Sequence, residues 1–183
     1  MPYHSGNELI DPYIIFDKAQ LRPGMHAADF GCGKTGHILF PAAVIIGEHG
    51  VIYGVDIMKD DLAIIAKHAA LERLHNIHTI WSDIERIGAT AIPAGSLDLI
   101  FLINILHAIH DRTNALAEAT RLLKDKSRLV LVDWKANNLP IGPKPEKLVD
   151  FTAIAAWAAE NKYVVQEEFE AGKYHNGVVL YRV

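Results

Sequence analysis

The sequence of 183 residues has one cysteine, Cys32, so it can form neither an intrachain disulfide nor a cysteine-based zinc site. It has no excess of basic residues: the formal net charge is −4, which disfavours a nucleic-acid partner. No apolar run reaches the about 18 residues needed to span a bilayer. The longest run, LDLIFLINILHAI, is interrupted by Asp98, Asn104 and His107. The opening segment MPYHSGNELIDPYIIFDK carries acidic residues and lacks the uninterrupted apolar core of a signal peptide. These absences predict a cytoplasmic protein without a membrane span, whose oligomeric state is open.

What the sequence does contain is an alternation of short apolar runs and helix-length amphipathic runs, without repeats or a composition break. This alternation is typical of a parallel sheet covered on both faces, so we expect one α/β domain over residues 1–183, folded as a three-layer α/β/α sandwich. The expected strands are 26–32, 51–57, 76–83, 96–104 and 127–135, and the expected helices are 7–20, 37–47, 60–74, 111–124 and 146–161. The chain then predicts two strands joined by AGKYHNG, residues 171–177. So short a joint permits only an antiparallel pair.

The stretch DFGCGKTG, residues 29–36, lies between the first expected strand and a helix, where a glycine-rich loop lets backbone amides approach a ligand. A phosphate-binding P-loop requires a glycine five positions before Gly-Lys-Thr, but Ala28 stands there. The letters GCGKTG do satisfy the G-x-G-x-x-G dinucleotide fingerprint. Asp56 ends the next strand, twenty residues after Gly36, where a carboxylate can bind a ribose. This spacing supports a nucleoside ligand without naming it.

Asp29 distinguishes between the nucleoside ligands. It ends the first expected strand, two residues before Gly31, beside the place of a dinucleotide pyrophosphate. A carboxylate there repels phosphates, whereas it attracts a ligand that carries an ammonium and a sulfonium by about one to a few kcal/mol. The alternative is that Asp29 only caps the following helix or binds amides of the turn.

Several segments, in order, resemble the motifs of class I S-adenosylmethionine-dependent methyltransferases of the ubiquinone/menaquinone-biosynthesis-like group. They are AADFGCG, VIYGVDI, WSDIERI, GSLDLIFLINILHAI and ATRLLKDKSRLVLVDWK, followed by the terminal YHNGVVLYRV. The resemblance implies a Rossmann-like, mostly parallel seven-stranded sheet with strand order 3-2-1-4-5-7-6 and an antiparallel last strand. It also implies S-adenosylmethionine as cofactor and a helix within residues 1–20 that packs over the cofactor site.

By the same resemblance, the cofactor-binding residues are Asp29, Gly31, Cys32, Gly33, Asp56, Ile57, Ser82, Asp83, Ile84 and Asn104. Asp29, Gly31 and Gly33 are expected near the methionine part, Asp56 at the ribose, and Asp83 with Ile84 at the adenine. One departure stands out: the family runs Gly-x-Gly-x-Gly, and here the third glycine, Gly36, comes one residue late.

Methyl transfer needs alignment of the reactants, and a general base only if the nucleophile arrives protonated. His107 follows the fourth strand at the ligand-binding edge and is the best candidate base; the alternative is a histidine that caps or packs. Tyr174 in the terminal joint is a second candidate, with an exposed turn as its alternative. The pairs His107/His110 and His75/His78 have no third ligand placed by a motif, so no metal site is expected.

We therefore expect a methyltransferase acting on a small organic acceptor. The fold uses nearly all residues, so only the first helix, the loop NNLPIGPKPE (137–146) and the joint 171–177 remain to build an acceptor pocket. Three alternatives stay open: a protein or RNA acceptor, a non-catalytic binding or regulatory module, and an NAD-dependent oxidoreductase.

Overall fold

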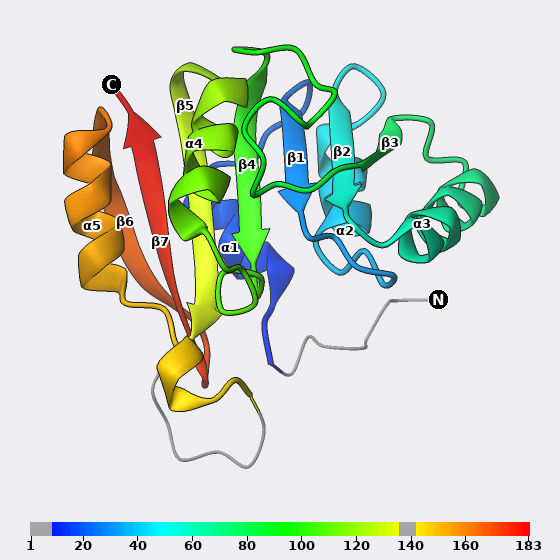
Figure 1. Ribbon diagram of the computed structural model, residues 1–183. Helices are drawn as coiled ribbons and strands as arrows, with labels where there is room; N and C mark the ends of the chain where they lie inside the picture. Colours follow the sequence, from blue (N-terminus) through cyan, green and yellow to red (C-terminus); the bar gives the residue numbers. More distant parts are fainter. Residues whose placement is uncertain (1–8, 136–141) are drawn as a thin grey trace.

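Seven strands form one sheet in the computed structural model, which describes residues 9–135 and 142–183 (Figure 1). The strand order is β3-β2-β1-β4-β5-β7-β6. The strands are β1 (His26–Phe30), β2 (Val51–Asp56), β3 (Ile77–Trp81), β4 (Leu97–Ile103), β5 (Leu123–Trp134), β6 (Tyr163–Gly172) and β7 (His175–Arg182). Neighbouring strands from β3 to β5 pair in parallel, whereas β7 is antiparallel to both β5 and β6. The predicted fold class and strand order are confirmed.

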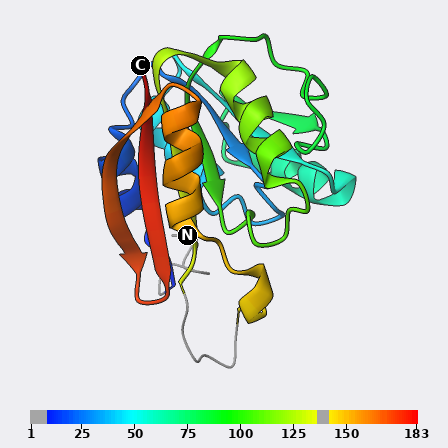
Figure 2. The same cartoon turned by 60° about the vertical axis from the view of Figure 1, so that its left-hand side comes forward.

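Helices cover both faces of the sheet, which explains why the central strands read as continuous apolar runs. One core layer buries α1 (Pro12–Ala19), α2 (Leu39–Ile46) and α3 (Lys59–Leu71). The other buries α4 (Arg112–Leu122) and α5 (Phe151–Glu160). Figure 2 shows α5 on one side of the β6–β7 hairpin and α1 on the other. In the described residues, no helix is long and apolar enough to cross a membrane.

The first and last helices are shorter than the sequence suggested. Helix α1 begins at Pro12, after Asp11, whose Oδ1 accepts a hydrogen bond from the Tyr13 amide at 2.9 Å. A proline at the first helical position lacks only an amide that would have no helical partner, so the helix starts there rather than at residue 7. Similarly, the Asp150 side chain caps α5, and residues 145–147 form a separate 3-10 turn, η1 (Pro145–Lys147). Residues 7 and 8 lie outside the described residues.

Helix α1 contacts β5 and β6, with Ile15, Phe16 and Ala19 buried. Its position over a bound cofactor stays a prediction. The segment before the helix lies nearer the carboxyl edge of the sheet: the Ile10 carbonyl is 2.9 Å from His37 Nε2, and the Leu9 carbonyl packs against Gly172.

The expected loop 171–177 is wrong in extent. Strand β6 continues to Gly172 and β7 begins at His175, so only Lys173 and Tyr174 form the turn. The extra pairing follows from the register, in which His175 lies opposite both Gly172 and Trp134. This joint is therefore mostly paired strand. Of the loop 137–146, residues 137–141 lie outside the described residues.

Gly177 makes room for an aromatic ring in this hairpin. A Cβ placed on Gly177 would lie 2.5 Å from Cζ of Phe169 on β6. We expect Gly177→Ala to destabilise the fold by about 1–3 kcal/mol, because the added methyl overpacks the ring. Urea unfolding measures the effect. The double variant Gly177→Ala with Phe169→Leu should recover part of the loss, and additive losses would contradict this account.

Candidate functional site

A cavity of about 200 Å³ lies at the carboxyl ends of β1, β2, β3 and β4, the lower edge of the sheet in Figure 1. It is lined by Gly31, Val55, Asp56, Ile57, Ser82, Asp83, Ile84, Glu85, Ile105, Ala108 and Ile109. Six of the ten residues expected to bind the cofactor are thus brought together: Gly31, Asp56, Ile57, Ser82, Asp83 and Ile84. Ligands bind at this edge in open α/β sheets, at the place where the strand order reverses.

The Asp56 carboxylate ties the glycine loop to the end of β2. Its Oδ2 accepts a hydrogen bond from the Gly33 amide at 2.9 Å, and its Oδ1 accepts one from the Met58 amide at 2.9 Å. Each carboxylate oxygen has two lone pairs, so both keep acceptor capacity for a ligand hydroxyl. The loop therefore holds Asp56 in place without using up its acceptors.

The first amides of the glycine loop are directed at β2. The amides of Gly31 and Cys32 donate to the Val55 carbonyl at 2.8 and 3.3 Å, and the Gly33 amide donates to Asp56. A phosphate-binding loop instead points successive free amides at its anion. This arrangement disfavours a pyrophosphate at these three amides.

Gly31 lies where a side chain cannot fit. Its φ is +77°, and an added Cβ would lie 2.8 Å from Cγ1 of Ile105, on the opposite wall of the cavity. Gly36, the late glycine, also has a positive φ, and its added Cβ would meet the rings and methyls of Phe40 and Ile65 at 2.7–2.8 Å. Gly36 therefore serves the packing of α2 and α3, which explains why it falls outside the family spacing.

Asp29 is buried, and its carboxylate has no hydrogen bond within residues 9–135 and 142–183. It therefore neither caps a helix nor binds turn amides there. Burial raises the pKa of Asp29 to about 7, and the nearby negative charge of Asp56 adds to the rise. Such a carboxyl group is prepared to ionise next to a positively charged ligand.

The remaining expected cofactor residues lie outside the cavity lining. The Cys32 thiol is turned toward Gly54 in the core, and burial raises its pKa above the ordinary range, so it is an unreactive packing group. Gly33 contributes its amide to Asp56. Asn104 follows β4 with φ +55°, and its buried Oδ1 has no hydrogen-bond partner in the part of the chain that the structure describes.

The second wall of the cavity was missed by sequence reasoning. Ile105, Ala108 and Ile109 follow β4, and Glu85 faces them from the other side. The Glu85 carboxylate accepts hydrogen bonds from the amides of His110 and Asp111 at 3.1 and 2.6 Å, so it joins the two walls. The apolar residues around Asn104 in the run LDLIFLINILHAI were a usable signal, because they continue past the expected strand end.

His107 belongs to the same segment as Ile105 and Ala108 but is not among the residues that line the cavity, and it forms a pair with Asp133 of β5. His107 Nδ1 is 2.9 Å from Asp133 Oδ1, and the His107 amide donates to Oδ2 at 3.2 Å. Asp133 is fully buried, whereas the His107 side chain is 23% exposed. An ionised Asp133 carboxylate can only accept, so this geometry suits a ring whose Nδ1 donates to Asp133 and whose Nε2 is left as an acceptor.

Tyr174 lies apart from this pair in the hairpin turn, where its carbonyl accepts from the Lys135 amide at 2.9 Å and Lys173 Nζ lies over its ring. Its neighbour His175 is fully buried, with its ring 4.4 Å from that of Trp134. Burial lowers the pKa of His175, so this ring favours the neutral form. Within the described residues, neither ring nitrogen of His175 has a well-formed hydrogen bond, and the nearby backbone of Leu9 offsets part of the effect of burial on its pKa.

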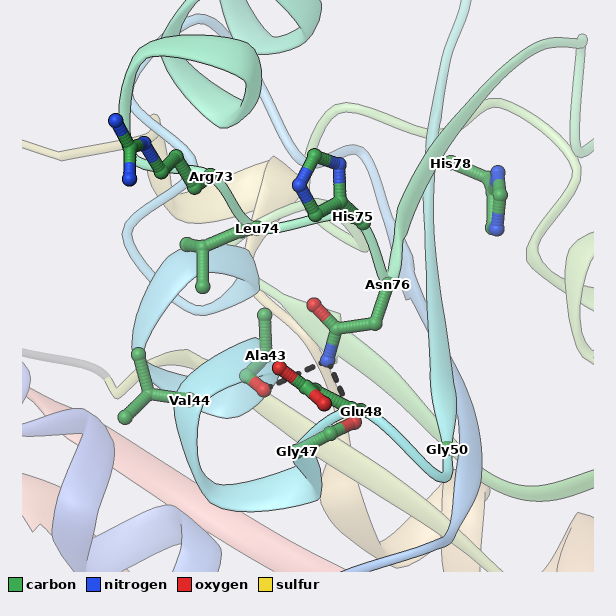
Figure 3. Close-up of a pocket in the computed structure, with 10 residues that line it drawn as sticks. All are labelled: Ala43, Val44, Gly47, Glu48, Gly50, Arg73, Leu74, His75, Asn76 and His78. Atoms are coloured by element: carbon green, nitrogen blue, oxygen red, sulfur yellow. Dashed lines mark hydrogen bonds between the residues drawn. The ribbon is translucent and has the colours of Figure 1, made fainter.

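A larger cavity of about 660 Å³ lies at the opposite, amino edge of the sheet (Figure 3). Asn76 lines this cavity, and its Nδ2 donates to the carbonyls of Ala43 and Gly47 at 2.8 and 3.0 Å, so the side chain caps the end of α2. His75 and His78 point into different parts of this region. No group of three metal-ligating side chains occurs in residues 9–135 and 142–183. None of the expected site residues lies at this edge.

The carboxyl-edge site fits S-adenosylmethionine on three observations. Asp29 offers a buried carboxylate without a hydrogen bond toward positive charge. Asn104 offers a buried oxygen without a donor in the described part of the chain. Gly31 lets the loop after β1 pack directly against Ile105 beside the cavity, where a Cβ would come within 2.8 Å of that side chain.

Asp29→Asn tests the electrostatic cost of this site. The folded-state pKa of about 7 exceeds the ordinary value of 3.8, so the carboxyl group favours folding below the ordinary pKa and loses that contribution as the pH rises through 7. We expect the free energy of unfolding of Asp29→Asn, relative to that of the wild type, to rise by about 1–3 kcal/mol between pH 5 and pH 8. Urea unfolding at both pH values measures this gain. The exposed Asp60→Asn is the control, and an equal pH response in both variants would contradict the assignment.

Comparison with known proteins agrees with this geometry. A family model described as a methyltransferase domain matches residues 21–176. Nocamycin O-methyltransferase of Saccharothrix syringae is 31% identical over 155 residues, 79% of this chain and 52% of the relative. Aklanonic acid methyltransferase of Streptomyces is 31% identical over 131 residues, 70% of this chain and 58% of the relative. The chain thus spans about half the length of the curated relatives it matches.

Among solved structures, a SAM-dependent methyltransferase from Aquifex aeolicus superposes with a TM-score of 0.87 at 26% identity. The alignment covers 98% of this chain and 94% of that chain. Family match, fold and site thus agree: the chain belongs to the methyltransferase domain family, as a class I S-adenosylmethionine-dependent member.

Proposed function

We propose that this chain transfers a methyl group from S-adenosylmethionine to an oxygen atom of a small organic acceptor, with His107 as general base. The observation that carries the proposal is the pairing of His107 with the buried Asp133, because His107 lies in the segment whose Ile105, Ala108 and Ile109 line the cavity. The name of one relative, nocamycin O-methyltransferase, supports an oxygen acceptor and a small molecule.

The cofactor residues take the following roles in this proposal. Asp29 stabilises the positive charge of the methionine part, and Asp56 accepts from the ribose hydroxyls with its remaining lone pairs. Asp83 and Ile84 contact the adenine, while Ile105 and Ile109 close the cavity from the other side. The bound cofactor supplies a methyl group activated by the positively charged sulfur.

His107 removes the acceptor proton. Asp133 holds the ring through Nδ1 and the main chain through the His107 amide, so the orientation of the ring is set at two points. Nε2 then accepts the proton, and Asp133 stabilises the resulting imidazolium. The dyad supplies both the base and its positioning.

The need for a base indicates the class of acceptor. A carboxylate is already ionised near pH 7, whereas a phenol or enol hydroxyl arrives protonated and gains from proton removal. We therefore propose a weakly acidic hydroxyl on a small organic compound as the acceptor group. Tyr174 as a second catalytic residue, a single domain over residues 1–183 and a cytoplasmic location stay predictions from the sequence.

Isothermal titration with S-adenosylhomocysteine and with NAD tests the cofactor assignment. The amides of Gly31, Cys32 and Gly33 are engaged with β2 and Asp29 disfavours a pyrophosphate, so we expect S-adenosylhomocysteine to bind and NAD not to bind. Binding of NAD alone would favour the oxidoreductase. Cofactor binding without formation of S-adenosylhomocysteine from a panel of phenols, enols and cell extract would favour the non-catalytic module.

His107→Gln tests the base. We expect it to lower turnover about 10²–10⁴-fold near pH 7 without changing the affinity for S-adenosylhomocysteine, because only proton transfer is lost. The deficit should shrink as the pH approaches the pKa of the acceptor hydroxyl, since the acceptor then ionises without help. S-adenosylhomocysteine release with a responsive phenol or enol is the readout.

His110→Gln is the matched control for this variant. His110 lies three residues further on and is exposed, and it bonds Glu85 through its backbone amide, which the substitution keeps. Equal turnover in the His107 and His110 variants, or a deficit that is constant with pH, would contradict the role of His107.

A further inference from the structure

Glu118 is a fully buried carboxylate in the middle of α4. A glutamate is almost never fully buried unless it is paired. Arg121, one turn further along the helix, pairs with both oxygens: Nε lies 2.8 Å from Oε2 and Nη2 lies 2.8 Å from Oε1. This two-point pair compensates the cost of burial, but it does not by itself explain why a charge lies here.

The same two carboxylate oxygens of Glu118 also accept hydrogen bonds from the connection between β3 and β4. The Gly88 amide donates to Oε2 at 2.7 Å and the Thr90 amide donates to Oε1 at 3.0 Å. Arg121 Nη2 also donates to the Thr90 carbonyl at 3.0 Å. The ion pair on α4 thus fastens the main chain of residues 88–90, a stretch without regular secondary structure.

The hydrogen bonds continue from residues 88–90 to the wall of the cavity. The Thr90 hydroxyl is 3.1 Å from the Ser82 hydroxyl, and both residues are buried. Ser82 lines the cavity and precedes Asp83 and Ile84, which line it too. A continuous set of hydrogen bonds therefore runs from Arg121 and Glu118 through Thr90 to the wall of the cavity.

The charge state of this set is constant over the working pH range. Burial alone would raise the pKa of Glu118, but the Arg121 pair and the amides of Gly88 and Thr90 outweigh it and lower the pKa to about 2. Because the folded-state pKa is depressed, the stabilisation is present above the ordinary pKa and is lost only as the pH falls through about 2. The hydrogen bonds from the ionised Glu118 to residues 88–90 therefore persist over the working pH range.

The same connection has a second attachment to α4 near its start, where Glu85 accepts from the amides of His110 and Asp111. The wall Ser82–Glu85 is thus held from both sides: Glu85 at the near end and Glu118 through Thr90 at the far end. Irregular backbone that carries binding groups gains precision from such support.

We propose that Glu118 is a positioning residue for the nucleoside wall of the cofactor site, acting through Thr90 on Ser82 and its neighbours. The inference rests on the proposed function, since it assigns this wall to S-adenosylmethionine. Glu118 touches no ligand in this proposal; it sets the geometry of the residues that do.

Two variants test the proposal, with S-adenosylhomocysteine and adenosine as probes. Glu118→Gln should raise the Kd of both probes about tenfold, because the amide cannot accept from Gly88, Thr90 and Arg121 together. It should also lower hydrogen-exchange protection of the Gly88 and Thr90 amides. Thr90→Val keeps the amide bond to Glu118 but removes the hydroxyl, which contacts Ser82 and also helps to lower the pKa of Glu118, so it should raise the Kd about threefold with a smaller loss of Tm than Glu118→Gln.

Matched controls separate positioning from general stability. Thr120→Val makes the same substitution on α4, where the hydroxyl bonds Leu116 and Tyr163 instead of the wall. Asp98→Asn neutralises one partner of the Lys124 ion pair at the start of β4. Both should leave the Kd unchanged at temperatures where the proteins are folded. The same Kd in Glu118→Gln as in the wild type, with only Tm lowered, would overturn the proposal, as would weakened S-adenosylhomocysteine with unchanged adenosine binding. Absence of wild-type binding would overturn the proposed function and this inference with it.

Discussion

The site depends on the reversal of strand order at β1. From β1 the chain proceeds through β2 to β3 on one side, then returns to place β4 and β5 on the other. The connection after β1 leads to α2 in one layer, and the connection after β4 leads to α4 in the opposite layer. The two connections must therefore part at the carboxyl edge. Gly31, after β1, and Ile105, after β4, pack against each other at this point, and both line the cavity.

Two buried carboxylates show how the protein uses charge on these two sides. Burial acts on both Asp29 and Glu118 in the same direction, toward the neutral acid. Glu118 has an arginine and backbone amides as partners and stays ionised, whereas Asp29 has no hydrogen bond in the described residues and has a pKa of about 7. The first carboxylate is satisfied by the protein and serves its framework. The second is left for a ligand to satisfy, at a cost to the stability of the free protein.

The fold and much of the cofactor cavity could be predicted because the chemistry lies at strand ends that apolar runs mark. Asp56 and Asp83 follow such runs, and the order of the motifs supplied the strand order. Long-range partners could not be predicted this way: nothing in the sequence pairs His107 with Asp133, or Glu118 with residues 88–90. The extent of the terminal hairpin was wrong because His175 reads as a polar turn residue, yet pairing with Gly172 and Trp134 buries it. Tertiary contacts decided these positions against local preference.

The place of β7 in the sheet also sets an order of assembly. This strand follows β6 in the chain but lies between β5 and β6, so β6 has no partner in the sheet until β7 is present. Until then, β5 exposes an apolar edge that includes Leu129, Val130 and Leu131. Unpaired apolar edges attract other chains during synthesis and refolding. The β6–β7 hairpin therefore covers the edge of β5 as one unit, through β7.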